Sequence, residues 1–311
     1  MKNLFLIFVL ALNLNAYEIL ELSASVTTLK QDKNTLYIGT NGGQISSLDL
    51  NLGVSSQNLK KVAEFGKIKN SYDESFSPQI YSIDVYKDSF LIISEADLGG
   101  KNLSTLKDGV LNTKRFEFDG LKKAYFIDEN TYLFVFTGAT ITLVDSNLNV
   151  LKSFKFNHSL LNNSNINPQR NTLEVDFESG EIKLFDIKKW EVIANFDAIH
   201  KDNIYQVDYK NNVLVSCAID GKLGVIKNNQ QNFIQKDFFI YACALSPNGE
   251  LIAYSDYNEN TIEIVKSSNF EKIASFKNAD DKLVVRNILF IDDNKFSISG
   301  YDNKIFFWSV K

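Results

Sequence analysis

The chain has 311 residues, of which 44% are hydrophobic and 13% aromatic, a composition that suits a soluble, β-rich fold. Its 33 Lys and Arg residues against 38 Asp and Glu residues give a net charge of −5, and no basic stripe with interleaved aromatic residues occurs, which argues against a nucleic-acid partner. With only two His residues, His158 and His200, the sequence lacks the ligand cluster of a His or mixed Cys/His zinc site.

The first 16 residues have the organisation of an export signal. Lys2 supplies a positive charge, residues 4–12 form an apolar run, and Ala16 is a small residue before Tyr17. An uncleaved membrane anchor is the alternative, but a span needs about 20 apolar residues and this run has nine. We therefore expect a signal peptide over residues 1–16, a periplasmic mature protein, and no stable membrane span after cleavage.

The mature chain repeats a short pattern in which a polar turn is followed by alternating apolar residues. Three clear copies are Gly42–Asp49, Gly138–Asp145 and Ser179–Asp186, and three weaker ones are Asp220–Ile226, Glu259–Val265 and Asp302–Trp308. The first apolar residues of these copies follow one another at 96, 41, 41, 39 and 43 positions: Ile45, Ile141, Ile182, Leu223, Ile262 and Ile305. A repeat of this length, with Gly and Asn at its turns, is typical of a β-propeller.

The first gap is a double one, which predicts a seventh, degenerate copy between Ile45 and Ile141. We place it where Phe90–Ser94 turns through Gly99-Gly100 towards Val110. The 295 residues of the mature chain then give about 42 per blade, inside the range of roughly 40–45 for WD40-type units. The predicted fold is all-β, a seven-bladed WD40-like β-propeller that forms a single domain over residues 17–311.

The strand order of one unit can be followed between residues 203 and 237. Four strands are predicted there: Ile204–Tyr209, Val213–Ala218, Lys222–Ile226 and Gln231–Gln235. The last copy ends at Lys311 without room for a fourth strand, whereas Tyr17–Leu22 is a strand-like run outside every copy. We therefore predict that this N-terminal strand completes the last blade and closes the ring.

Several residues favour a divergent WD40-like repeat. The turn Ser246–Gly249 resembles the first hairpin of a WD40 unit, and Trp308-Ser309 stands where such a unit has Trp-Asp. We expect Trp190 and Trp308 to pack inside blades.

His200 precedes the first strand of its unit, where WD40 repeats often place a His that forms hydrogen bonds in the blade core. We favour that structural role. The alternative places His200 on a binding surface at the rim of the funnel, together with Lys201, Asp202 and Tyr205.

Cys217 and Cys243 lie in apolar strands of adjacent units. In an oxidising compartment they have two interpretations, a disulfide that ties two blades together or two buried free thiols. Neither is expected to be catalytic, because each has apolar neighbours and no His nearby in sequence.

The sequence contains no catalytic signature such as a Gly-x-Ser-x-Gly elbow, a phosphate loop or a dinucleotide fingerprint. The acidic pairs Asp128-Glu129, Asp280-Asp281 and Asp292-Asp293 fall between strands and are expected to be solvated turn residues. Oxygen ligands at Asp256–Asn260 could hold calcium, but they lack the full spacing of an EF-hand loop. We predict a protein that is not an enzyme, with no catalytic, cofactor-binding or metal-binding residues and no cofactor.

Along its whole length the chain resembles the accessory L proteins of periplasmic nitrate reductase systems. The resemblance rests on the start Tyr17-Glu-Ile-Leu after a short signal and on the blade segments Ser179–Ile187 and Asp220–Val225. It implies a non-catalytic periplasmic interaction protein that acts in nitrate reductase maturation or electron delivery, with components of that system as protein partners.

Two enzyme classes remain as alternatives. A metal-dependent propeller hydrolase or lactonase would need acidic and Asn or His ligands from several blades that converge in the central channel. A quinone-cofactor dehydrogenase would have adjacent cysteines and a larger set of blades, both of which this sequence lacks.

Overall fold

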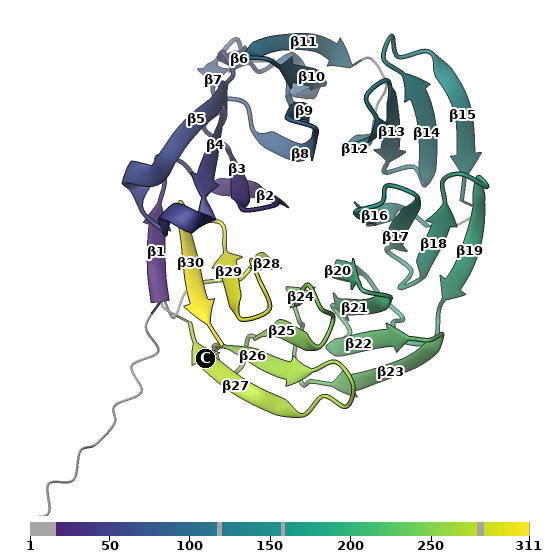
Figure 1. Ribbon diagram of the computed structural model, residues 1–311. Coiled ribbons are helices and arrows are strands. Elements are labelled where there is room, and N and C mark those ends of the chain that lie inside the picture. The colour runs from purple at the N-terminus through teal and green to yellow at the C-terminus, as the bar shows by residue number, and fades with distance from the viewer. Residues whose placement is uncertain (1–16, 117–119, 157–158, 279–282, 311) are drawn as a thin grey trace, which may run out of the picture.

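The computed structural model describes residues 17–310 except 117–119, 157–158 and 279–282, so the predicted signal peptide lies outside the described residues. Within them, seven four-stranded antiparallel sheets stand around a central axis (Figure 1). The predicted seven-bladed propeller is therefore confirmed. The described part of the chain has no helix of the length and apolarity needed to cross a bilayer.

Each of the first six blades is a meander of four consecutive strands, numbered from the axis to the rim. Blade 1 has β2 (Val26–Asp32), β3 (Thr35–Thr40), β4 (Gln44–Asp49) and β5 (Leu59–Glu64); blade 2 has β8 (Ile80–Tyr86), β9 (Ser89–Glu95), β10 (Lys101–Lys107) and β11 (Val110–Phe116); blade 3 has β12 (Leu121–Asp128), β13 (Thr131–Phe136), β14 (Thr140–Asp145) and β15 (Val150–Lys155).

The remaining blades follow the same plan. Blade 4 has β16 (Leu161–Ile166), β17 (Thr172–Phe177), β18 (Ile182–Asp186) and β19 (Glu191–Phe196); blade 5 has β20 (Ile204–Lys210), β21 (Val213–Ala218), β22 (Lys222–Lys227) and β23 (Gln230–Gln235); blade 6 has β24 (Cys243–Leu245), β25 (Leu251–Asp256), β26 (Thr261–Lys266) and β27 (Lys272–Lys277); blade 7 has β28 (Asn287–Phe290), β29 (Lys295–Ser299), β30 (Lys304–Ser309) and β1 (Tyr17–Glu21).

The ring closes through β1, as predicted. Strand β1 pairs antiparallel with β30 from Tyr17 opposite Trp308 to Glu21 opposite Lys304, and the two strands lie side by side in Figure 1. Leu20 is fully buried, in the apolar cluster between blades 7 and 1. The strand that begins at Tyr17 is thus held by the last strand of the chain, β30.

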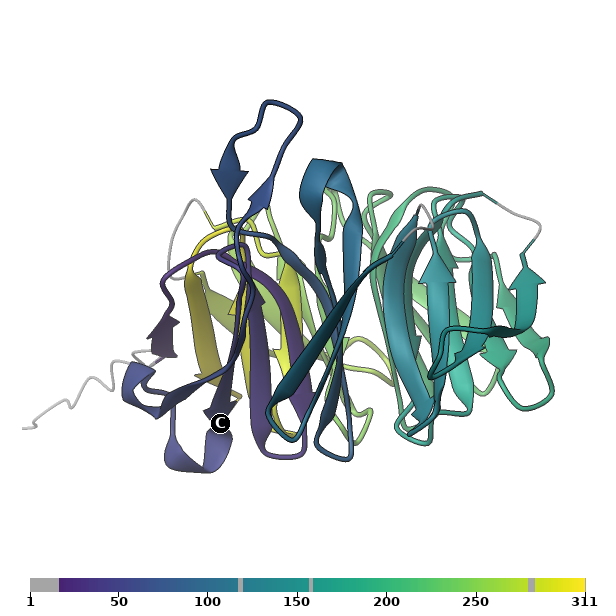
Figure 2. The same ribbon diagram turned by 90° about the horizontal axis from the view of Figure 1, so that it is seen from above.

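The predicted degenerate copy is blade 2. Strand β9 covers Phe90–Ser94, and the short 3₁₀ segment η3 (Asp97–Gly99) leads into β10, with Gly99 at a φ of 75°. An element that the repeat did not predict is the hairpin β6–β7 (Ile68–Lys69 and Ser75–Phe76), between blades 1 and 2. It stands out from the disc (Figure 2). Tyr72, between its two strands, is 83% exposed.

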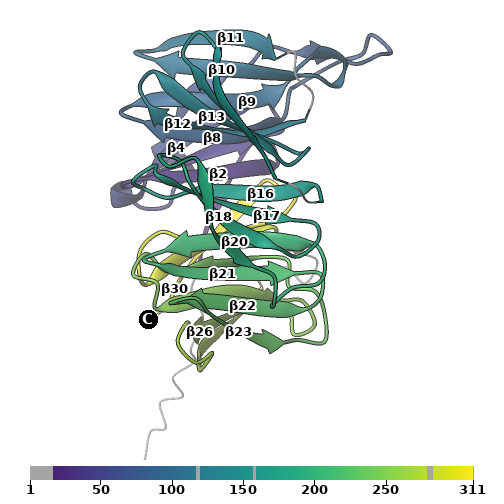
Figure 3. The same ribbon diagram turned by 90° about the vertical axis from the view of Figure 1, so that its right-hand side faces the viewer.

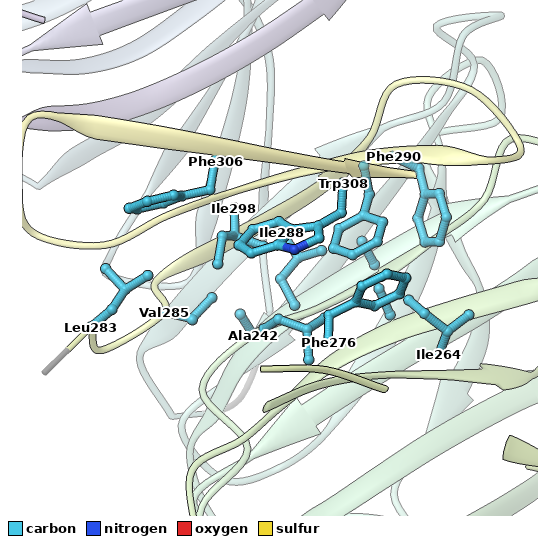
Figure 4. Packing of buried hydrophobic residues seen from close by; sticks show 14 residues of the cluster. Ala242, Ile264, Phe276, Leu283, Val285, Ile288, Phe290, Ile298, Phe306 and Trp308 are labelled. Atoms are coloured by element: carbon cyan, nitrogen blue, oxygen red, sulfur yellow. The ribbon is translucent and has the colours of Figure 1, made fainter. Parts of the chain in front are cut away.

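The hydrophobic core is divided among the interfaces between blades. Seven apolar clusters of described residues lie one at each interface, because alternate residues of a strand face opposite neighbours. Figure 4 shows the cluster between blades 6 and 7, where the Trp308 ring lies near Ile288 and Phe276. Full burial of one such side chain is worth about 1.5–3 kcal/mol, so each interface contributes substantially to the ring.

The disc has two distinct faces. Because the strands of a blade alternate in direction, connections between blades share one face with the turns between second and third strands. We call this the hairpin face, because β6–β7 belongs to it, and we call the other the opposite face. In the side view of Figure 3 the strands run across the disc from one face to the other.

Candidate functional site

A cavity of about 630 Å³ lies in the central channel, and all seven blades or their connections contribute to its wall. Its lining is mostly polar side chains and tyrosines, from the following residues: Thr27, Thr28, Leu29, Tyr81, Lys122, Lys123, Asn162, Asn163, Asn165, Tyr205, Gln206, Val207, Asp208, Lys210, Tyr241, Val284, Val285, Arg286, Asn287, Ile288, Leu289 and Tyr301. Its volume is within the range of roughly 300–1,000 Å³ typical of ligand sites. The cavity is therefore the candidate site.

Aromatic residues gather on the hairpin face where blades 5 and 6 meet the channel. The ring centroids of Tyr205 and Tyr241 are 5.2 Å apart, and those of Tyr241 and Tyr257 are 5.8 Å apart. Phe238 stacks on Tyr257 at 5.0 Å and on Phe239 at 4.6 Å. We call these five residues the aromatic patch. Tyr257 is exposed and the other four are partly exposed, and aromatic residues are enriched at protein interfaces.

The aromatic patch continues towards blade 7. Tyr301, in the turn between β29 and β30, is 68% exposed, and the Arg286 guanidinium lies 5.0 Å from its ring centroid. Both residues also line the cavity, so the hairpin face has aromatic and cationic groups at the channel mouth.

Lys122 and Lys123 of blade 3 line the cavity, and Lys101 of blade 2 lies close to Lys122. Lys123 Nζ donates a hydrogen bond to the carbonyl of Ser164 at 2.7 Å, and Lys101 and Lys122 likewise donate to carbonyls in the first strand of the next blade. Burial lowers the pKa of all three ammonium groups, that of Lys123 to about 8. These groups are therefore desolvated cations held against the backbone.

Two carboxyl groups are buried behind the wall that β16 forms. Asp176 and Glu174 of β17 pair with Asn163 and Asn165 of β16. Burial raises the pKa of both groups, that of Asp176 to about 7. Both Asp176 oxygens lack a hydrogen-bond partner among the described residues. These carboxyls are thus shifted towards their neutral form.

At the channel mouth on the opposite face, the Asp84 carboxylate of β8 is fully paired with neighbouring groups. We call this arrangement the saturated network. The Asp84 carboxylate accepts hydrogen bonds from Arg170 Nη1 at 2.6 Å and from the Phe126 amide at 2.9 Å, and Lys30 Nζ lies 3.0 Å away. Burial by itself would raise the pKa of Asp84, but Lys30 and Arg170 hold it below its usual value. Arg170 also donates to the carbonyls of Phe126 and Val85. The network joins blades 1 to 4.

Comparison with known proteins gives a fold and no family. No protein-family model and no curated protein matches the sequence. The β-propeller domain of Cps50 (Swd1) from Myceliophteria thermophila is similar over 93% of this chain and 97% of that chain, with a TM-score of 0.71 and 16% identity. The WD40 β-propeller domain of Doa1 is similar over 95% of this chain and 97% of that chain, with a TM-score of 0.67 and 14% identity. The chain has the WD40 β-propeller fold.

His200 lies inside blade 5 of this WD40 propeller. Its Nε2 is 2.7 Å from Ser216 Oγ and its Nδ1 is 3.1 Å from Asp220 Oδ1, and the side chain is almost fully buried. The structure therefore places it in a blade-core network, the role favoured from the sequence. Among its predicted rim neighbours, Tyr205 lines the cavity. His158 lies outside the described residues.

Cys217 and Cys243 are fully buried free thiols at the interface of blades 5 and 6. Their sulfurs lie 3.7 and 3.5 Å from the same acceptor, the Gln206 carbonyl oxygen. Burial raises the pKa of the Cys243 thiol, so it is a poor nucleophile. Of the two interpretations, the structure therefore has two buried free thiols and not a disulfide.

The two tryptophans have packing roles, as expected. Trp308 is buried between blades 6 and 7 and stacks on Phe296 with ring centroids 5.9 Å apart. The Trp190 ring meets the Phe185 ring edge-on at 5.2 Å.

The acidic pairs in the described residues are turn residues. Asp128 and Asp292 accept hydrogen bonds from the amides of Asn130 and Asn294, each two residues further on. Asp256, the first residue of the conceivable calcium segment, forms an ion pair with Lys236 at 2.8 Å. Asp280-Asp281 lies outside the described residues.

The lining of the cavity does not match the ligand set of the hydrolase alternative. That alternative needs converging acidic ligands, but the carboxylate in the lining, Asp208, lies 3.0 Å from Lys210 Nζ and accepts from the Leu245 amide at 2.9 Å. The described residues contain no group of three or more His, Cys, Asp or Glu side chains that could hold a metal ion.

Neither the three lysines Lys101, Lys122 and Lys123 nor most of the aromatic patch had been predicted from the sequence. A usable signal for the patch was the run Phe238-Phe239-Ile240-Tyr241, which places three aromatic residues in a connection between blades. The lysines gave no comparable signal, because Lys101 belongs to a third strand and Lys122 and Lys123 to a first strand.

Proposed function

We propose that this protein is an exported, non-catalytic interaction protein that binds a protein partner with its hairpin face around the mouth of the central channel. The observation that carries the proposal is the aromatic patch at that mouth, which continues into Tyr301 and Arg286. Tyr257 remains 48% exposed and Tyr301 68% exposed, an arrangement suited to a partner that covers these rings. The WD40 β-propeller fold supports this function, because it is a fold of scaffold type.

The compartment and the partner of this proposal rest on the sequence. The organisation of residues 1–16 supports export to the periplasm. The resemblance to the accessory L proteins supports a partner from the periplasmic nitrate reductase system, in its maturation or in electron delivery to it. A rigid disc with a partly exposed aromatic patch suits either role, since both need a docked complex.

The experiment is affinity capture of the tagged, exported protein from native periplasm, followed by mass spectrometry of partners and metals. The test variant is the double substitution Tyr257→Ser and Tyr301→Ser. Its matched control is Phe233→Ser, because Phe233 is an equally exposed aromatic residue, at 47%, on the outer strand β23.

We expect the wild type and the Phe233→Ser variant to recover nitrate reductase subunits or their redox partners. The double variant should recover at least tenfold less of them. Equal recovery of the partner with all three proteins would show that the hairpin face is not the binding site. Stoichiometric bound metal without a partner would favour the hydrolase alternative.

A further inference from the structure

The lining of the channel carries a net positive charge, although the chain as a whole is negative. The chain has a net charge of −5, yet its cavity is lined by four cations, Lys122, Lys123, Lys210 and Arg286, and by a single carboxylate, Asp208. Asp208 already has Lys210 as its counter-ion at 3.0 Å. Three cations therefore face the cavity without an ion pair to any carboxylate in the described part of the chain.

The nearest buried carboxyls do not offset these cations fully. Asp176 and Glu174 lie behind β16 and act electrostatically on Lys123, but burial shifts both groups towards the neutral form. Lys122 is also within the field of Glu178, an exposed residue just after β17. The mouth is thus a positive, partly desolvated region of an acidic protein, and such a region attracts and retains anions.

The groups around these cations suit a peptide. Tyr81, Tyr205, Tyr241 and Tyr301 line the same cavity and offer rings and hydroxyls to an extended chain. The amides of Asn162, Asn163 and Gln206 lie in the wall and can satisfy peptide groups.

We propose that the central channel receives an acidic segment of the protein partner, whose Asp or Glu carboxylates bind Lys122, Lys123 and Arg286. This inference rests on the proposed docking function and adds the chemistry of what enters the channel. Carboxylates form short, charge-assisted hydrogen bonds with ammonium and guanidinium groups, and such bonds are about twice as strong as neutral ones. The segment enters from the hairpin face, where the tyrosines and the cations meet.

The test uses a fluorescein-labelled hexaglutamate peptide as the probe and measures anisotropy at low and moderate salt. The test variant combines Lys122→Ala and Arg286→Ala. The control combines Lys60→Ala and Lys114→Ala, which removes the same charge from exposed positions on the outer strands β5 and β11. Circular dichroism and the thermal midpoint establish whether both variants are folded. If the variant with both Ala substitutions is not folded, the variant with Lys122→Gln and Arg286→Gln replaces it.

We expect hexaglutamate to bind the wild type and the control with equal affinity, and to bind the test variant at least tenfold more weakly. The affinity for the wild type should fall steeply with added salt. A hexaserine peptide should not bind. No binding of hexaglutamate, or equal binding to all three proteins, would overturn it. If the Lys122 and Arg286 variant still captures the natural partner while the Tyr257 and Tyr301 variant does not, the docking function stands and the acidic occupant is wrong.

Discussion

At the opposite mouth of the channel, one buried carboxylate is contacted by a lysine, an arginine and a backbone amide, whereas the hairpin-face mouth presents cations without carboxylate partners among the described residues. First strands contribute to both mouths: β12, for example, supplies Lys122 to the hairpin-face mouth and the Phe126 amide to the opposite one. The same strands can therefore hold the ring together at one end and leave charge available for a partner at the other. Removal of one partner from the Asp84 network would leave a buried charge uncompensated, whereas the cations at the hairpin-face mouth are available to an anionic ligand.

Both mouths depend on the closed ring, so opening it should have the largest effect. Removal of residues 17–25 takes away β1, its ladder with β30 and the buried Leu20 side chain. We expect the whole domain to lose stability, and the single substitution Leu20→Ala to cost about 2–5 kcal/mol. Urea unfolding measures both, with Ile19→Ala as the control because Ile19 is 47% exposed. An unchanged thermal midpoint in the truncated protein would contradict closure by β1.

The next largest effect should come from the saturated mouth. Asp84→Ala leaves Lys30 and Arg170 as uncompensated charges in a buried site, and the loss of one partner from such a network costs about 3–5 kcal/mol. Asp237→Ala, at an exposed position, should change the free energy of unfolding by less than about 0.5 kcal/mol. Similar unfolding curves for the two variants would show that the network does not join blades 1 to 4.

A smaller, pH-dependent effect is expected from Asp176. Its pKa is raised to about 7 in the folded protein, so folding retains a proton that the unfolded chain releases above about pH 4. The stability that this group contributes is present at low pH and is lost as the pH rises towards 7. Asp176→Asn cannot ionise, so it should stabilise the protein by on the order of 1–2 kcal/mol at pH 8 and by much less at pH 5.

Urea unfolding at the two pH values measures the Asp176 effect. Glu178→Gln is the matched control, since Glu178 is exposed two residues further along the chain. The same gain at pH 5 and at pH 8 would mean that ionisation of Asp176 is not its cause.

The smallest effect on stability should come from the hairpin-face mouth. Lys122→Ala with Arg286→Ala removes no ion pair between described residues, so the free energy of unfolding should change by less than about 1 kcal/mol while peptide binding falls. Thermal unfolding and anisotropy on the same samples separate the two readouts. A large loss of stability would show that the hairpin-face mouth also stabilises the ring, so the two mouths would not differ in this respect.

The repeat allowed the architecture to be predicted from the sequence, including the degenerate blade 2 and the closing strand β1. It succeeded because the turn glycines and the alternation of residues are local signals; Gly180 and Gly221, for example, have φ values of 89° and 74° at the predicted turns. The hairpin β6–β7 was not predicted, because each of its strands has only two residues and no alternation is visible.

The charge arrangement of the channel could not be predicted in the same way. Asp84 and Arg170 are 86 residues apart, and Lys122 and Arg286 come from blade 3 and from the connection to blade 7. A repeat predicts that first strands meet at the axis, but it does not specify which side chains of non-neighbouring blades share a mouth. The packing of the ring decides that.

Partner binding at the hairpin face is tested by photocrosslinking in native periplasm with a photoreactive amino acid placed singly at Tyr301 and at Asn130. Tyr301 lies on the hairpin face, and Asn130 lies in an exposed turn between first and second strands on the opposite face. We predict that a nitrate reductase component is crosslinked from position 301 and not from position 130. Crosslinking from position 130 alone, or equally from both positions, would contradict it.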